Sequence, residues 1–191
     1  MSKRTWDSFH RRSDVLRAVV DQANERRDGV LPMELPGVAE TFGDDLSLVA
    51  ALQLRWHTRL AGRIERALME NPMELETAVV TAWRDAAGEL PGVRMILDAC
   101  TAHPSSEAMA DALETAHRKD WTLMAAMAGQ AGPGDAGAAK VGRALEVKAR
   151  ALYRPSAPTP RHRAEPVPSR GDVLKDQLRG RLTKIKAHLA A

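Results

Sequence analysis

The longest regular pattern in the chain lies between Asp45 and Glu70, where apolar residues recur every three or four positions. The residues at these positions are Val49, Leu52, Trp56, Leu60, Ile64 and Leu68. This spacing places them on one face of an α-helix, and Asp44 and Asp45 suit the positive N-terminal end of a helix dipole. We therefore predict one long amphipathic helix over 45–70 that turns this face towards a core.

Shorter segments repeat the same helical period along the rest of residues 1–153. They predict helices over about 7–27, 37–42, 72–87, 91–100, 107–129 and 138–152. Asn71 and Pro72 suit the cap and the first position of the fourth helix, and we expect Leu75 in that helix and Leu152 in the last one to face inward. No segment alternates apolar and polar residues with a period of two, and abundant Ala and Leu favour helices. The prediction is an all-α bundle of six or seven helices.

Charge divides the chain at the end of this bundle. Residues 1–153 hold 19 Lys/Arg and 22 Asp/Glu, a net charge of −3, whereas residues 154–191 hold 9 and 3, a net charge of +6. Five prolines favour an extended linker after residue 153, and an apolar stripe then recurs at helical spacing through Leu174, Leu178, Leu182, Ile185 and Leu189. We predict an all-helical body over 1–153, a Pro/Arg-rich flexible linker over 154–171 and a basic amphipathic helix over 172–191.

The basic tail is the first candidate binding region. Its candidate binding residues are Arg161, Arg163, Arg170, Lys175, Arg179, Arg181, Lys184 and Lys186. A segment of this kind typically contacts an anionic partner, and the sequence leaves open whether that partner is a protein or a nucleic acid. The tail helix lacks the Trp or Phe that membrane-surface helices favour. Its aliphatic stripe has two further interpretations, namely docking on the acidic body and pairing with a second copy in a homodimer.

A second candidate lies on the long helix, where Arg55, Arg59, Arg63 and Arg66 recur at steps of four and three. We refer to these four residues as the arginine row. Their guanidinium groups match the geometry of phosphates and carboxylates, so one interpretation is an anion-binding surface. The other interpretation is the solvated flank of an amphipathic helix, with Glu65 and Glu70 moderating its charge.

Signatures of catalysis are missing from the sequence. It contains no glycine-rich phosphate loop and no paired-histidine zinc motif, and its single cysteine, Cys100, falls on an apolar helix face, as a packing thiol would. Glu114 and His117 lie one helical turn apart, but a helical di-iron centre needs two such pairs and two further carboxylates. We predict no catalytic residue, no metal and no cofactor. A helical metal-dependent oxidase around Glu114 and His117 is the third hypothesis.

One segment suggests a different function. Ala39, Gly43 and Val49 have the spacing of a helix-turn-helix, and a predicted helix precedes them. With the chain length and the all-α prediction, this segment resembles the N-terminal part of the TetR family of bacterial repressors. The resemblance implies DNA binding through residues 37–60 and a helical ligand-binding and dimerisation domain after them. A DNA-binding protein is expected to have a basic face. Here Asp44 and Asp45 place negative charges at the turn, and residues 1–70 hold 11 Lys/Arg and 11 Asp/Glu.

These observations lead to one hypothesis and its alternatives. The chain has no apolar stretch of signal-peptide length at its start and no run of about 18 apolar residues, so we expect a cytoplasmic protein. Arginine outnumbers lysine 21 to 7, as is typical of high-GC bacterial genomes. We predict a non-catalytic bacterial regulatory or adaptor protein whose basic tail contacts an anionic partner, with a TetR-like DNA-binding regulator as the alternative.

Overall fold

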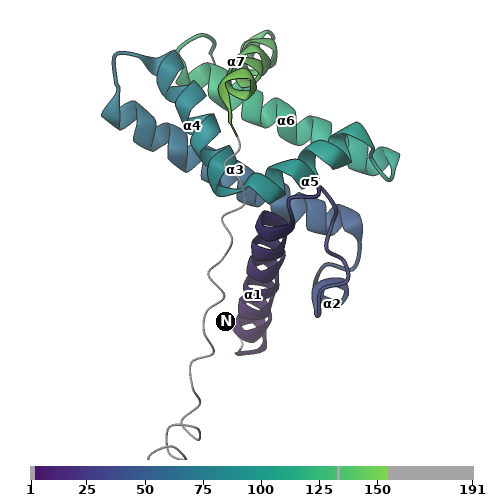
Figure 1. Cartoon of the computed structure of the whole chain (residues 1–191). Helices are drawn as coiled ribbons and strands as arrows, with labels where there is room; N and C mark the ends of the chain where they lie inside the picture. Colours follow the sequence, from purple (N-terminus) through teal and green to yellow (C-terminus); the bar gives the residue numbers. More distant parts are fainter. Residues whose placement is uncertain (1–2, 133, 155–191) are drawn as a thin grey trace, which may run out of the picture. The chain divides into compact units, whose positions relative to one another are not determined.

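The computed structural model describes residues 3–132 and 134–154, with side chains from Arg11 onward. This part of the chain forms seven helices and no strand, which confirms the all-α prediction. The helices are α1 (Lys3–Arg26), α2 (Val38–Phe42), α3 (Asp45–Glu70), α4 (Leu75–Glu89), α5 (Pro91–Ala102), α6 (Glu107–Met127) and α7 (Ala138–Leu152) (Figure 1). The basic helix predicted over 172–191 lies outside the described residues.

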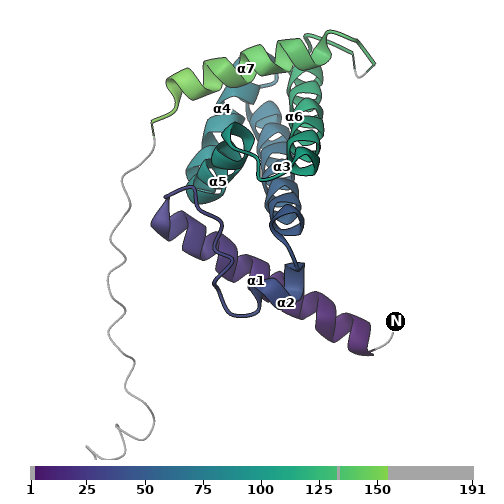
Figure 2. The same ribbon diagram turned by 90° about the vertical axis from the view of Figure 1, so that its right-hand side faces the viewer.

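Helix α3 is central to the core and packs against α4, α5 and α6. Figure 2 shows α3 and α6 side by side, with α7 crossing over α4 and α6. Leu52, Leu60 and Ile64 of α3 are fully buried, as the apolar pattern predicts. Trp56 of α3 meets Trp83 of α4 edge to face, with ring centroids 5.7 Å apart, a geometry that aromatic pairs prefer. The core therefore forms around the apolar face of the longest predicted helix.

Two glycines allow pairs of helices to approach closely. A Cβ atom at Gly92 of α5 would overlap the carbonyl group of Ala23 in α1, and one at Gly142 of α7 would overlap the carbonyl group of Trp121 in α6. At the first crossing, the side-chain oxygen of Asn24 also accepts a hydrogen bond from the Gly92 backbone N–H at 3.0 Å. At both crossings the glycine lies directly against the backbone of the neighbouring helix, which leaves no room for a Cβ atom.

The structure corrects the predicted start of the fourth helix. Asn71 does not begin α4 but ends α3, because its backbone N–H donates to the Ala67 carbonyl at 2.9 Å. A short turn follows, and α4 begins at Leu75. The predicted inward positions of Leu75 and Leu152 are wrong, since these side chains are 37% and 49% exposed. Each stands at a helix end, where fewer neighbours cover the apolar face.

The other helix boundaries differ little from prediction. Helix α1 begins at Lys3 rather than near residue 7, and α6 ends at Met127 rather than near residue 129. Gly129 follows the C-cap residue Ala128 of α6 and adopts a positive φ of 68°, a conformation that commonly ends helices. Along the described ranges, every helix is too short or too polar to cross a lipid bilayer.

Candidate functional site

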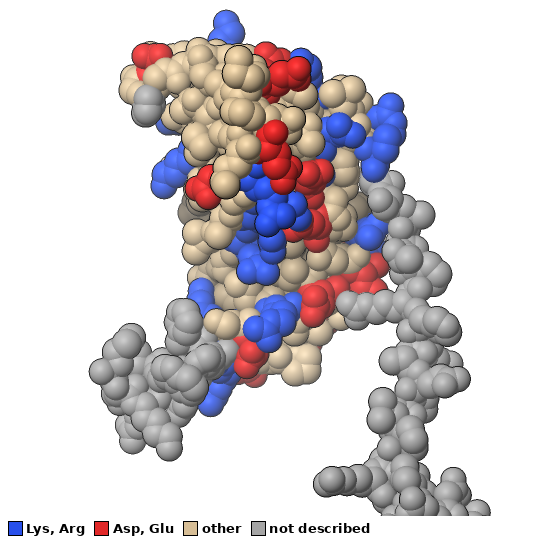
Figure 3. Space-filling view, turned by 90° about the vertical axis from the view of Figure 1, so that its left-hand side faces the viewer, with Lys and Arg blue, Asp and Glu red and all other residues tan. Residues whose placement is uncertain are grey.

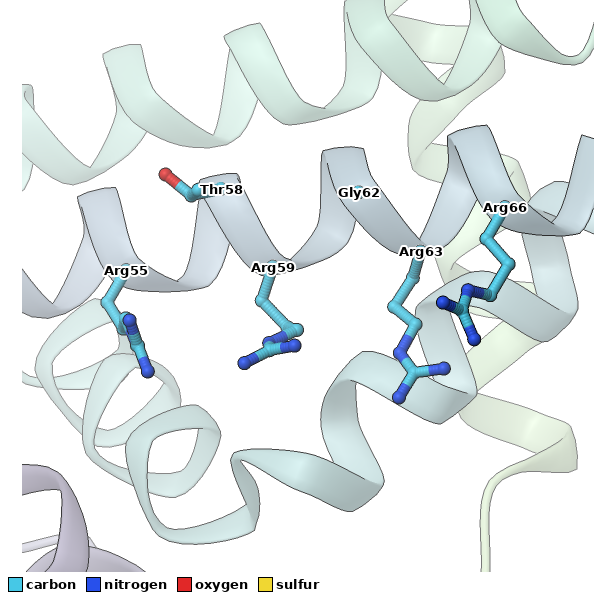
Figure 4. Close-up of a pocket in the computed structure, with 6 residues that line it drawn as sticks. All are labelled: Arg55, Thr58, Arg59, Gly62, Arg63 and Arg66. Atoms are coloured by element: carbon cyan, nitrogen blue, oxygen red, sulfur yellow. The ribbon is translucent and has the colours of Figure 1, made fainter.

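The arginine row projects from one side of α3. In Figure 4 all four arginine side chains extend on the same side of the helix, as steps of four and three residues require. They line an open hollow of about 390 Å³, which Thr58 and Gly62 also border. The row follows the flank of the buried stripe of α3, so the fold of this helix fixes its position.

A carboxylate already occupies the middle of the row. Glu89, the last residue of α4, forms an ion pair with Arg59, whose Nε lies 3.1 Å from its carboxylate, and also pairs with Arg63. Arg55 and Arg66, at the two ends, are exposed and make no hydrogen bond or ion pair with the described residues. The row therefore consists of an internally paired centre and two unpaired ends, which combines features of both interpretations drawn from the sequence.

The basic residues of the tail form the other candidate binding region. Arg161, Arg163, Arg170, Lys175, Arg179, Arg181, Lys184 and Lys186 all lie outside the described residues. Binding through the tail and pairing of two copies through its apolar stripe stay predictions.

The two candidate metal ligands lie near each other on α6 but have other partners. Glu114 forms an ion pair with Arg118 Nη2 at 2.9 Å on the surface. The His117 ring packs against Trp121, with centroids 5.6 Å apart, and burial lowers the pKa of its imidazole. Over the described ranges, no group of three or more His, Cys, Asp or Glu side chains is placed to hold a metal ion. The arrangement of Glu114 and His117 is that of a surface ion pair next to a packed imidazole.

Cys100 lies on α5 and is partly buried against the hydrophobic core. Burial raises the pKa of its thiol, and the nearby charge of Asp45 raises it further. A raised pKa keeps the group in the thiol form, whereas a nucleophile must be a thiolate. These surroundings are those of a packing residue.

The helix-turn-helix candidate comprises α2 and the first half of α3. Gly43 separates the two helices with a φ of 79°. The Asp44 side chain then caps α3 by accepting from the Ser47 N–H at 2.7 Å, and this hydrogen bond lowers the pKa of its carboxyl group. Helix α3 continues without a break for 26 residues, and Leu48 and Leu52 in its first half are fully buried. The aspartate at the turn thus stabilises the helix start, and DNA binding by residues 37–60 stays a prediction.

A buried polar cluster joins α3 to α6 on the other flank of the α3 core stripe. Asp120 of α6 is only 4% exposed and accepts a hydrogen bond from Gln53 Nε2 at 2.9 Å. Its other oxygen lies 2.5 Å from His57 Nδ1, within hydrogen-bonding distance. Burial raises the pKa of Asp120, while the hydrogen bond and charge of His57 oppose that shift.

Sequence reasoning missed this cluster, although a signal for it exists. Gln53 lies four residues after Val49 and Asp120 seven after Leu113, so both occupy positions in apolar faces. A polar residue in such a position usually has a buried hydrogen-bonding partner. The identity of that partner is a tertiary fact, because 67 residues separate Gln53 from Asp120.

A network of ion pairs lies between α5, α6 and α7. Asp98 accepts from Arg150 Nη1 at 2.9 Å and Nη2 at 2.8 Å, and it lies 2.9 Å from Arg94 Nη2. Arg94 is 5% exposed, and its guanidinium lies over the Trp56 ring at 4.8 Å. Glu146 pairs with Arg150 and accepts the Trp121 indole N–H. None of the residues of this network lines the hollow beside the arginine row.

No protein-family model, curated protein or solved structure matches this chain.

Proposed function

We propose that the chain is a non-catalytic adaptor or regulatory protein of the cytoplasm that binds an acidic segment of a partner protein. The observation that carries this proposal is the arginine row, whose Arg55 and Arg66 have no ionic partner among the described residues. Guanidinium groups form paired hydrogen bonds with carboxylates and retain their charge at any physiological pH. A lone cysteine with a raised pKa suits a reducing compartment.

Three observations favour carboxylates over a nucleic acid as the ligand of the row. Glu89 already makes the contact that a partner carboxylate would make, since it pairs with Arg59 and Arg63. The body carries a net charge of −3, which repels a densely charged phosphate backbone. On the face shown in Figure 3, basic and acidic side chains lie next to one another and form no continuous positive surface. Such a surface suits a partner with a few well-placed carboxylates.

The basic tail supplies the second part of the proposal. Its net charge of +6 attracts the same acidic partner over a distance set by salt screening. When the tail captures the partner, the effective concentration of the partner at the arginine row rises. The TetR-like DNA-binding regulator is the competing function, and the experiment below separates the two.

The test measures binding of a short fluorescein-labelled peptide of Glu and Asp by fluorescence anisotropy, at low and physiological salt. The variant combines Arg55→Glu with Arg66→Glu, which reverses both unpaired ends of the row. We expect about a tenfold loss of affinity, since each exposed charge contributes up to about 1 kcal/mol. The matched control combines Lys140→Glu with Arg143→Glu, two exposed residues of α7, and should bind like the unchanged protein.

Equal losses in both double variants would show that net charge alone drives binding and would overturn the role of the row. A double-stranded oligonucleotide serves as the competing probe in the same assay. Sequence-dependent binding of the oligonucleotide, together with failure of the acidic peptide to bind, would reject the adaptor in favour of the repressor.

A further inference from the structure

A second hollow lies between α3 and α6, on the flank of α3 opposite the arginine row. Its volume is about 340 Å³, within the range of small-molecule sites. Apolar side chains supply most of its wall, including Leu46, Val49 and Leu54 from α3 and Leu113 from α6. Leu54 is 65% exposed at its rim, which leaves apolar surface facing solvent. We refer to this hollow as the α3–α6 groove.

The polar cluster of Gln53, His57 and Asp120 also lines this groove. Two of its members are almost fully buried, Gln53 with 7% and Asp120 with 4% of its surface exposed. Burial of amide and carboxylate groups is costly unless they are hydrogen-bonded, and the cluster satisfies most of its own groups. The groove is thus an apolar space with a small polar region fixed in its wall.

One hydrogen-bond acceptor in this wall has no partner among the residues that the structure describes. The contact between Gln53 Nε2 and the Asp120 carboxylate sets the orientation of the Gln53 amide. Gln53 Oε1 is buried, and among the described residues no group donates to it. An unsatisfied buried acceptor costs about 1–3 kcal/mol, so a donor from a bound molecule would recover that cost. This atom is the observation that points to a ligand.

The charges around the groove favour a neutral ligand. The carboxyl group of Asp120 faces the imidazole of His57, and the positive charge of buried Arg94 also acts on it. Lys119 adds a positive group to the lining. Because these charges oppose one another, an ionic ligand would lose its hydration without gaining a single matched counter-charge.

From this geometry we propose that the α3–α6 groove binds a small, neutral, mostly apolar molecule that donates a hydroxyl hydrogen bond to Gln53 Oε1. The apolar part of the molecule covers Leu54 and the neighbouring wall, and the hydroxyl group meets the polar cluster. This site uses none of the four arginines, so it stands independently of the binding function proposed above. Occupied together, the two sites would place a small-molecule site and a partner surface on opposite flanks of one helix.

The test titrates the full-length protein with 3-phenylpropan-1-ol and with its methyl ether, following backbone amide shifts by NMR. The two probes share their apolar part, but only the alcohol has a donor. We expect the alcohol to shift amides of α3 and α6 at about millimolar concentration, with the ether at least about tenfold weaker. Gln53→Met keeps an apolar side chain of similar length and should bring the two affinities together.

A second variant keeps the proposal testable if Gln53→Met fails to fold. Ala112 is exposed and lines the groove, so Ala112→Phe should fill it and abolish alcohol binding. The matched control is Ala144→Phe, at an exposed alanine of α7 outside the groove, which should leave binding intact. Absence of alcohol binding at about 10 mM, equal affinities of the unchanged protein for the two probes, or full binding by Ala112→Phe would each overturn the proposal.

Discussion

At the scale of single residues, Asp98 determines whether a buried cation is compensated. Arg94 is nearly inaccessible to solvent, and its one ion pair in the described structure is with Asp98. Asp98 also accepts hydrogen bonds from both terminal nitrogens of Arg150. Burial acts to raise the pKa of Asp98, but the hydrogen bonds and charges of Arg150 and Arg94 outweigh it and lower the pKa. The carboxylate is therefore held ionised by the folded state.

The substitution Asp98→Asn should lower the free energy of unfolding by about 2–3 kcal/mol at pH 7, because Arg94 loses its counter-charge. The effect depends on pH in a defined direction. An aspartate with a lowered pKa stabilises the fold above its unfolded value of about 3.9, and this contribution is lost as the pH falls through the folded pKa. Urea unfolding at pH 7 and at about pH 3 should therefore show a larger difference between variant and unchanged protein at neutral pH.

Asp111→Asn is the control for this measurement. Asp111 is exposed in the first part of α6, the helix that begins at Glu107, and it makes no ion pair with the described residues. It should change stability by less than about 0.5 kcal/mol at either pH. A pH-independent difference for Asp98→Asn would mean that packing, and not the charge of Asp98, stabilises this corner of the fold.

At the scale of elements, the crossing of α1 and α5 depends on a missing side chain. Gly92 lies against the backbone of Ala23, and Asn24 connects the two helices further. The Asn24 side-chain N–H₂ also donates to the Glu89 carbonyl at 3.4 Å, near the end of α4. This contact places α1 against the junction between α4 and α5, close to the carboxylate that pairs with the arginine row.

Gly92→Ala should therefore destabilise the protein by about 2–4 kcal/mol, because the two backbones must separate. Gly88→Ala is the matched control, since a Cβ atom at Gly88 would meet no atom within 4 Å. Gly88 lies in the last turn of α4, where the exchange should stabilise the fold by at most about 1 kcal/mol. Thermal unfolding followed by circular dichroism compares the two, and equal effects would contradict the proposed close contact.

The elements themselves were predictable where one periodic pattern dominates. The bounds of α3 were predicted because its apolar stripe is long and Asp44 marks its start. The start of α4 was not, since Asn71 and Pro72 suit a helix start but the backbone of Asn71 completes the preceding helix. The contact at Gly92 and the pairing of Gln53 with Asp120 join distant segments, so no local pattern could identify the partners.

At the scale of the whole molecule, two candidate binding surfaces share one helix. The apolar stripe of α3 fixes the orientation of both flanks, so that the arginine row lies on one side and the α3–α6 groove on the other. The arginine row could be predicted from spacing alone, because its four members belong to one helix. The groove needed the tertiary structure, because half of its wall comes from α6. The tail adds a charge of opposite sign to that of the body.

Removing the tail tests how the row and the tail divide the binding of an acidic partner. Residues 157–191 hold 8 Lys/Arg and 3 Asp/Glu, so a chain ending at residue 156 changes its net charge from +3 to −2. We expect this shortened chain to bind the Glu/Asp peptide more weakly and with less dependence on salt, because long-range attraction is lost. Anisotropy titrations at low and physiological salt measure both effects.

The arginine row should still matter in the shortened chain. Arg55→Glu with Arg66→Glu should weaken binding by a similar factor with or without residues 157–191, since contributions from separate sites add. Circular dichroism must first show that the shortened chain keeps its helical content. If the folded shortened chain binds no peptide at low salt, the tail alone holds the partner. In that case the unpaired arginines of α3 are the solvated flank of an amphipathic helix.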